Sequence, residues 1–240
     1  MDCVRLKGDG EGTVIFLNGL RYELSYWNEA NKKKKINLPA KINCFSSVFL
    51  FNLPYEFYKL DFLTLVQKLL ELFEENELKK PYILVGHSIG GLISQVLSYL
   101  FPEFVKAVLL IDSSFTGPIL INRLKTYLET EKQTLKRETF ACLIDNLKAL
   151  EPILKVPEKV PFFSIANIKA DYSKIIETFG GGDYKKFYED FREKLDNHKK
   201  ITSYNEHSKT ILVFDASHAV HHKKPQMVLD LIKELIFSEF

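Results

Sequence analysis

The chain has 240 residues, 46% of them hydrophobic and 27% charged, and its formal net charge is only +2. This composition is typical of one folded globular domain, and it excludes a disordered or fibrous chain. The small net charge and the scattered lysines argue against a nucleic-acid partner, because the one basic run, Lys32–Lys35, is short enough for a solvated loop.

Cysteine usage and the first residues both bear on the cellular compartment. The three cysteines include no CxxC pair, which favours free thiols in a reducing compartment over a disulfide framework or a zinc site. The first residues, MDCVRLKGDGEG, lack the apolar stretch of a secretory signal. We therefore expect a cytoplasmic protein that needs no metal.

Short apolar runs alternate with helical patterns along the chain. Strands are predicted around 4–7 and at Thr13–Leu17, Phe45–Phe51, Tyr82–Val85, Val105–Ile111, Val160–Ile165 and Thr210–Phe214. Helices are predicted after Asp61, which is placed to cap the first turn, at Ile89–Leu100, at Tyr184–Leu195 and after Pro225. This alternation is typical of an α/β fold with a mainly parallel central sheet flanked by helices.

One segment departs from the alternation. Between residues 115 and 158, apolar residues recur at helical spacing with no strand between them, which predicts two or three helices. We interpret this segment as a small helical cap, inserted over the top of the sheet within a single domain that spans residues 1–240.

The segment from Pro81 to Pro102 imitates a membrane span. It contains no Asp, Glu, Lys or Arg and is long enough to cross a bilayer. However, its centre is Gly-His-Ser-Ile-Gly-Gly, which suits a strand, a sharp turn and a buried helix better than one continuous helix. We expect no membrane span here.

The glycines and serine of this segment form the pattern G-x-S-x-G. The residues 86–90 follow a predicted strand and begin a predicted helix, where small neighbours let the two elements approach closely. Such a turn holds Ser88 in a strained, accessible conformation suited to a nucleophile. The N–H of Ile89, at the helix start, and the N–H of Leu20, after the strand predicted at Thr13–Leu17, would form an oxyanion hole.

A serine nucleophile needs a histidine base. His218 is the best placed, because it follows the strand predicted at Thr210–Phe214 and precedes the last helix. His198 and His207 lie in polar stretches of sequence with no strand end to hold them. His87, beside the nucleophile, is interpreted as a packing residue.

The base needs a carboxylate to orient it, and two aspartates are available. Asp112 ends the strand predicted at Val105–Ile111, so a buried element can hold it rigidly. Asp171 lies several residues beyond the next strand. We favour Asp112, and Asp171 remains the alternative.

Four segments of the chain resemble the α/β-hydrolase superfamily. VIFLNG, VGHSIGG, AVLLIDSS and ASHAVHHKKPQMV occur in the order typical of that family and extend over nearly the whole chain. The resemblance implies the α/β-hydrolase fold and favours His218 over His221 or His222 as the base. This chain departs from many relatives in having Asn18-Gly19 where they carry His-Gly.

The resemblance implies a serine hydrolase. Its substrate would be a carboxylic ester, or alternatively a thioester, of a small to medium apolar molecule, cleaved through an acyl-enzyme without a cofactor. Two other interpretations stay open at this point. One is an acyltransferase, or other chemistry of the same triad, and the other is a ligand-binding protein of the same fold with little turnover.

Overall fold

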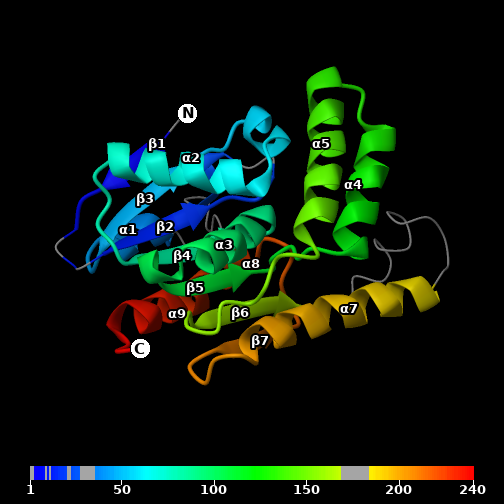
Figure 1. Ribbon diagram of the computed structural model, residues 1–240. Helices are drawn as coiled ribbons and strands as arrows, with labels where there is room; N and C mark the ends of the chain where they lie inside the picture. Colours follow the sequence, from blue (N-terminus) through cyan, green and yellow to red (C-terminus); the bar gives the residue numbers. More distant parts are fainter. Residues whose placement is uncertain (1–2, 9, 11, 21–22, 28–35, 169–183) are drawn as a thin grey trace.

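A seven-stranded sheet forms the centre of the protein, as seen in a computed structural model that describes residues 3–8, 10, 12–20, 23–27, 36–168 and 184–240 (Figure 1). Its strands are β1 (Cys3–Leu6), β2 (Thr13–Leu17), β3 (Ser47–Phe51), β4 (Tyr82–His87), β5 (Val105–Ile111), β6 (Phe162–Asn167) and β7 (Lys209–Val213). They lie side by side in the order β1-β3-β2-β4-β5-β6-β7. Only β1 runs antiparallel to its neighbour, so the carboxyl ends of the other strands share one edge.

Helices cover both faces of this sheet. One face carries η2 (Tyr55–Lys59), α2 (Phe62–Glu75), α3 (Ile89–Leu100), η3 (Pro102–Phe104) and α7 (Tyr184–Thr202). The opposite face carries η1 (Leu24–Trp27), α1 (Leu38–Ile42), α8 (Val220–Lys223) and α9 (Pro225–Phe237). Successive strand residues point to opposite faces, so each strand contributes to both hydrophobic layers. The predicted α/β architecture is confirmed.

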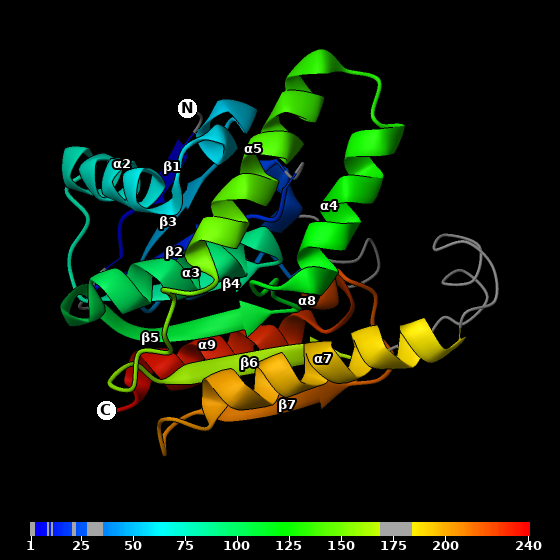
Figure 2. The same cartoon turned by 45° about the vertical axis from the view of Figure 1, so that its right-hand side comes forward.

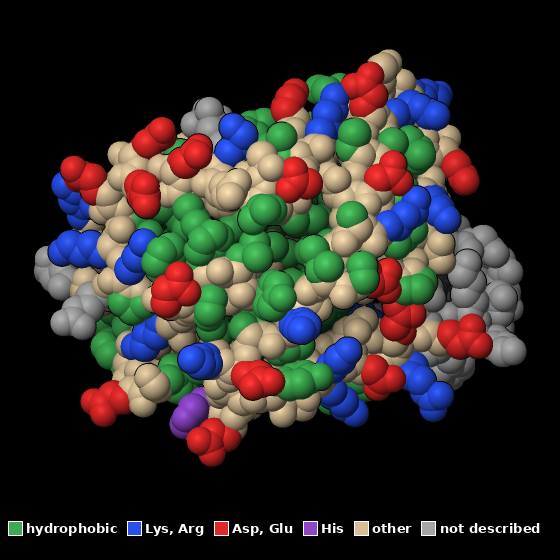
Figure 3. Space-filling view, viewed as in Figure 1, with side chains coloured by type: hydrophobic (Ala, Val, Ile, Leu, Met, Phe, Trp, Pro, Cys, Tyr) green, Lys and Arg blue, Asp and Glu red, His purple; other side chains and the backbone are tan. Residues whose placement is uncertain are grey.

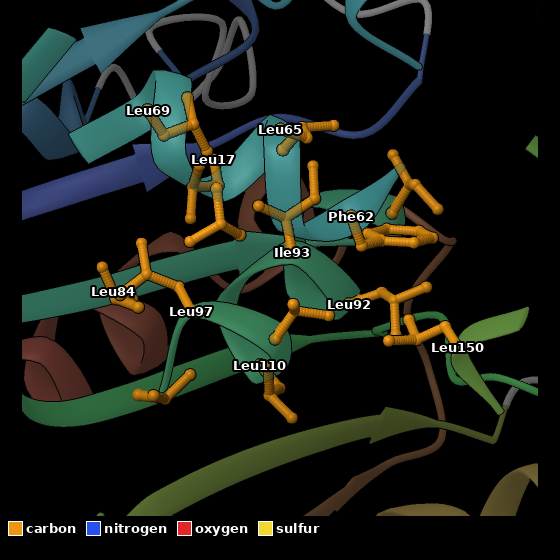
Figure 4. Close-up of a cluster of buried hydrophobic side chains, with 14 of the residues drawn as sticks. Leu17, Phe62, Leu65, Leu69, Leu84, Leu92, Ile93, Leu97, Leu110 and Leu150 are labelled. Carbon is orange, nitrogen blue, oxygen red and sulfur yellow. The ribbon is translucent and has the colours of Figure 1, made fainter. Parts of the chain in front are cut away.

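Helix α3 lies at the centre of the first hydrophobic layer. Every residue from Ile89 to Ser98 is buried, as expected for a helix that is apolar on all sides. In Figure 4 its side chains Leu92, Ile93 and Leu97 lie among leucines that come from strands and from α2. Burying a leucine of this kind contributes about 1.5–3 kcal/mol, so this packing holds α3 firmly against the sheet.

Helices α4 (Pro118–Thr130) and α5 (Thr134–Leu150) fill the segment between β5 and β6. They form an antiparallel pair that rises beyond the carboxyl edge of the sheet (Figures 1 and 2). Three contacts fasten α5 to η2 and the residue after it: Thr139 Oγ1 donates to Tyr55 O (3.4 Å), Asn146 Nδ2 donates to Leu60 O (2.6 Å), and Lys59 pairs with Glu138 (2.7 Å). The helical pair is therefore anchored at its side as well as at its ends.

Several predicted strand boundaries differ from the structure by one or two residues, and the end of one helix differs by more. Strand β3 begins at Ser47, two residues after the predicted start. Helix α7 continues to Thr202, although the helix was predicted to end at Leu195. The charged sequence after Leu195 contained no apolar pattern, but His198 and Ile201 are buried against the sheet and extend the inner side of the helix.

The surface matches the balanced composition. Figure 3 shows acidic and basic side chains interspersed over one face of the molecule, in keeping with the formal net charge of +2. Among the described residues, no helix combines the length and the apolar character needed to cross a membrane. The apolar segment between Pro81 and Pro102 instead forms β4, the turn at Ser88 and the buried helix α3.

Candidate active site

Ser88 lies in the turn between β4 and α3, with φ 54° and ψ −122°. A positive φ in a residue other than glycine costs about 1–3 kcal/mol, so the surrounding structure must hold it in place. The Ser88 N–H donates to Ile111 O (3.3 Å), and the Ser88 carbonyl accepts from Ser114 N (2.9 Å). These bonds tie the turn to the end of β5, and they leave the Ser88 side chain partly exposed.

The turn needs glycine on both sides of Ser88. A Cβ atom at Gly86 would lie 2.6 Å from the Cα of Gly91, closer than side chains approach in proteins. A Cβ atom at Gly90 would collide with the carbonyl oxygens of Leu17 and Asn18. The pattern G-x-S-x-G is thus explained by the close approach of α3 to β2 and β4.

His218 and Asp112 form a short polar contact next to Ser88 in the cavity wall. His218 Nδ1 lies 2.6 Å from Asp112 Oδ2, and because an ionised carboxylate only accepts, the histidine nitrogen donates. The proton on Nδ1 leaves Nε2 with a lone pair. The side chain of Asp112 is 3% exposed and that of His218 is 41% exposed, so a buried carboxylate at the sheet edge holds a ring that is open to the cavity.

The backbone holds Asp112 in place. Asp112 directly follows β5 and has φ 44°, a conformation that aspartate tolerates better than most residues. Its N–H donates to Ile165 O (2.9 Å), and its Oδ1 accepts from the backbone N–H of Asn167 (3.2 Å). Strand β6 therefore fixes both the main chain and the side chain of Asp112.

A lysine that the sequence pattern did not indicate also contacts this aspartate. Lys194, on α7, forms an ion pair with Asp112 Oδ1. Burial raises the pKa of Asp112, but the charge of Lys194 and the hydrogen bond from His218 outweigh burial and hold that pKa below its usual value. Asp112 is consequently ionised at neutral pH.

His87 packs against the ring of His218. The two ring centroids lie 4.5 Å apart, and His87 Nε2 donates to the His218 carbonyl oxygen at 3.0 Å. Burial, with a smaller effect from the charge of His218, lowers the pKa of His87 to about 3. A neutral, buried imidazole thus supports the ring and the main chain of His218, in line with the packing role predicted for it.

His221 and His222, on α8, pack against Tyr26 on the same face of the sheet as His87. His221 is fully buried and packs edge-on against Tyr26, with 4.5 Å between centroids. His222 Nε2 donates to the Tyr26 carbonyl oxygen at 2.6 Å. Within the part of the chain that the structure describes, no group of three His, Cys, Asp or Glu side chains is arranged to hold a metal ion.

Two backbone N–H groups border the same space as Ser88. Leu20 follows β2, and Ile89 is the first residue of α3, where an N–H has no partner within the helix. Among described atoms neither N–H has a hydrogen bond. The Asn18 side chain steadies the loop before Leu20, because it accepts from Trp27 Nε1 and donates to Asn52 Oδ1 (3.2 Å).

One cavity of about 580 Å³ brings the predicted site residues together. Ser88, His218, Asp112, Leu20 and Ile89 all line it. The rest of its wall is mixed in character. The helical pair contributes the apolar side chains Ile119, Leu120, Leu124, Tyr127 and Leu143, and polar groups come from α4, from α7 and from the segment after β5: Arg123, Glu193, Lys194, Asn197, Ser113, Ser114 and Thr116. No hydrogen bond joins the described side chains of Ser88 and His218, a contact that often tightens only when substrate binds.

Two sequence predictions need separate comment. Asp171, the alternative acid, lies outside the described residues. The polar surroundings predicted for His198 are wrong, because His198 is fully buried, with Nδ1 2.7 Å from Ser164 Oγ and its ring edge-on to Phe115. Burial lowers its pKa to about 3. His207, by contrast, is exposed as expected.

Comparison with known proteins adds independent support for the fold. A family model described as alpha/beta hydrolase fold matches residues 39–150. An alpha/beta hydrolase enzyme from the metagenome of sediments from the lagoon of Mar Chica, Morocco, is 20% identical, with 97% of this chain and 92% of that chain covered and a TM-score of 0.61. No curated protein matches the sequence significantly.

Two further solved structures share this architecture over nearly their whole length. The carboxylesterase structure from the thaumarchaeon Nitrososphaera gargenis is 13% identical, with 98% of this chain and 93% of that chain covered and a TM-score of 0.66. The enol-lactonase from Burkholderia xenovorans LB400 is 13% identical, with 99% and 96% covered and a TM-score of 0.65. The family match over residues 39–150 and the solved structures together show that this chain has the α/β-hydrolase fold.

Proposed function

We propose that this protein is a serine hydrolase that cleaves carboxylic esters through an acyl-enzyme. The observation that carries the proposal is the single cavity bordered by Ser88 in its strained turn, by the His218–Asp112 pair and by two N–H groups without partners. Two of the structurally similar proteins are an enol-lactonase and a carboxylesterase, which agrees with this class of reaction. A thioester would fit the same chemistry.

The proposed reaction begins with attack of Ser88 Oγ on the acyl carbon. His218 Nε2 takes the hydroxyl proton as the new C–O bond forms, and Asp112 stabilises the resulting imidazolium through Nδ1. The tetrahedral intermediate then expels the alcohol, which leaves with the proton from His218. In the second half, His218 takes a proton from water, the hydroxide attacks the acyl-enzyme, and the acid is released as Ser88 regains its proton.

The negative charge on the acyl oxygen needs hydrogen-bond donors that are already in place. The N–H groups of Leu20 and Ile89 supply them, and the start of α3 adds the partial positive charge of a helix N-terminus. Donors of this kind contribute about 3–4 kcal/mol each in related chemistry. Because both are backbone groups, among single substitutions only one to proline would remove either N–H.

The walls of the cavity suggest the substrate. The helical pair, which we treat as the cap spanning residues 115–158, contributes Ile119, Leu120, Leu124 and Leu143. Apolar side chains of this number favour an acyl or alcohol group of small to medium size. A cavity of about 580 Å³ leaves room for such a group beside Ser88.

A fluorophosphonate probe and a panel of p-nitrophenyl esters test the proposal. We expect the probe to label the folded protein, and the panel to be hydrolysed with a preference for short to medium acyl chains. Ser88→Ala should abolish both, whereas Ser203→Ala, which alters an exposed serine at the end of α7, should abolish neither. Failure of the wild-type protein to react with the probe and with every ester would refute the proposal.

A further inference from the structure

Lys194 is the strongest feature of the site that the proposed reaction does not yet use. It comes from α7, lines the catalytic cavity, and pairs with Asp112 Oδ1. Its side chain is 30% exposed, so it is partly withdrawn from water while Asp112 is almost wholly so. An ion pair placed in this way interacts more strongly than a pair on the open surface.

The two oxygens of Asp112 have separate partners. Oδ2 accepts from His218 Nδ1 (2.6 Å), whereas Oδ1 accepts from Lys194 Nζ and from the N–H of Asn167 (3.2 Å). Lys194 Nζ also lies 3.4 Å from the Asn167 carbonyl oxygen, so it joins the end of β6 to the carboxylate. The lysine therefore fixes which oxygen faces His218.

The charge of Lys194 also changes what Asp112 does to His218. A lone carboxylate beside a histidine favours the protonated ring. A lysine on the far oxygen offsets that negative charge, so the ring is drawn less strongly toward the protonated form. The histidine then remains a base at lower pH, and the aspartate still orients its Nδ1–H.

We propose that Lys194 is a positioning residue that orients the Asp112 carboxylate and sets the pH at which His218 becomes a base. This inference rests on the proposed function of His218. It assigns to α7 a direct influence on the reaction, although no atom of Lys194 needs to contact the acyl group.

Several other titratable groups lie near His218, but Lys194 is the cation that pairs with Asp112, the carboxylate partner of His218. From β4, His87 faces the ring, and from α8, His221 packs beside His87. Burial lowers the pKa of His87 to about 3 and lowers that of His221 well below its ordinary value, so both rings are neutral at neutral pH. His222 of α8 lies behind Tyr26 and His221, and Arg123 of α4 and Glu193 of α7 line the cavity itself.

The test is an NMR titration of the imidazole resonances of the whole protein between pH 4.5 and 9, with His218→Asn used to assign the His218 signals. In Lys194→Met we expect the titration midpoint of His218 to move upward by about one pH unit, at the low end of the effect of a unit charge within ~6 Å. Lys194→Arg should keep the wild-type midpoint. Lys199→Met, which removes an exposed charge from the same helix, should do so too.

If the protein hydrolyses an ester of the panel, the pH dependence of kcat/KM provides a second readout. The acidic midpoint of kcat/KM should rise with the NMR midpoint in Lys194→Met, so that activity well below the midpoint falls about tenfold, since one pH unit is a factor of ten. Because the titration requires no turnover, it remains informative even if every ester in the panel is inert. The proposed function and this inference can therefore fail separately.

Lys194→Gln separates charge from hydrogen bonding and serves as the second variant if Lys194→Met does not fold. Its amide can still donate to Asp112 but carries no charge, so we expect the same upward shift. An unchanged midpoint in a folded neutral variant would overturn the proposal. So would an equal shift in Lys199→Met, because the effect would then belong to the overall charge of the protein.

Discussion

Asp112→Asn tests the candidate site most sharply, because the structure dictates how the new amide must lie. Two donors, Lys194 Nζ and the Asn167 N–H, meet at the Oδ1 position. The amide oxygen of the new side chain must occupy that position, since an amide NH₂ there would face two donors. The NH₂ group is then directed at His218 Nδ1, where the carboxylate previously accepted.

This arrangement moves the proton of the neutral His218 ring from one nitrogen to the other. Nδ1 of His218 has to accept from the amide, so the proton moves to Nε2, the nitrogen that receives the hydroxyl proton of Ser88 in the proposed reaction. Loss of the carboxylate charge also removes the stabilisation of the imidazolium. In a serine protease triad the equivalent change lowers kcat about 10⁴-fold, and we expect a loss of about 10³- to 10⁴-fold here, or about 4–5 kcal/mol of transition-state stabilisation.

The assay is steady-state ester hydrolysis at pH 8, with circular dichroism and thermal unfolding to show that the variant is folded. The rate of fluorophosphonate labelling should fall in parallel with kcat. The reasoning is refuted if folded Asp112→Asn keeps more than a tenth of the wild-type kcat. A loss of activity in Asp171→Asn but not in Asp112→Asn would instead identify Asp171 as the acid.

Three further substitutions address packing, substrate size and pH. Gly90→Ala should lower the unfolding free energy in urea by about 3 kcal/mol, because its Cβ meets the carbonyl oxygens of β2 and the loop after it; a loss under 0.5 kcal/mol would contradict this. Ile119→Trp should reduce kcat/KM for longer acyl chains more than for acetate, whereas an unchanged chain-length profile would exclude this wall as the acyl site. Stability should fall from about pH 6.5 toward pH 3, because unfolded His87 and His198 bind protons that their folded forms, with pKa about 3, do not. His198→Gln should make that fall shallower by up to about 1.4 kcal/mol per pH unit in pH-dependent urea unfolding. Equal slopes in His198→Gln and wild type would contradict the assignment.

Local sequence was sufficient for the elements that position Ser88. Strand β2, helix α3 and strand β5 begin and end where apolar runs and glycines predicted, and the predicted cap at Asp61 is present, with Oδ1 2.9 Å from Thr64 N. Each of these features depends on residues that are neighbours in the chain. The turn at Ser88 is a further example, because Gly86 and Gly90 are required by the strand and helix that flank it.

Contacts between distant segments were harder to anticipate. His198 looked like a surface residue because its neighbours in the sequence are charged, yet it lies on the side of α7 that packs against β6. Lys194 lies within the helix predicted at Tyr184–Leu195, but nothing in the charged sequence around it indicated that its side chain would pair with Asp112. Charged helices have weak hydrophobic periodicity, so their inner side is defined by the sheet beneath them.

By itself, the sequence determined the alternation of strands and helices, the turn that holds Ser88, and the order in which serine, aspartate and histidine follow the strands. These depend on periodicity and on glycine, which act over a few residues. Only the tertiary structure decided that Asp112 divides its two oxygens between His218 and Lys194, and that His87 supports the His218 ring. The physical reason is that these contacts join β4, β5, α7 and the loop after β7, whose proximity arises from the strand order of the folded sheet.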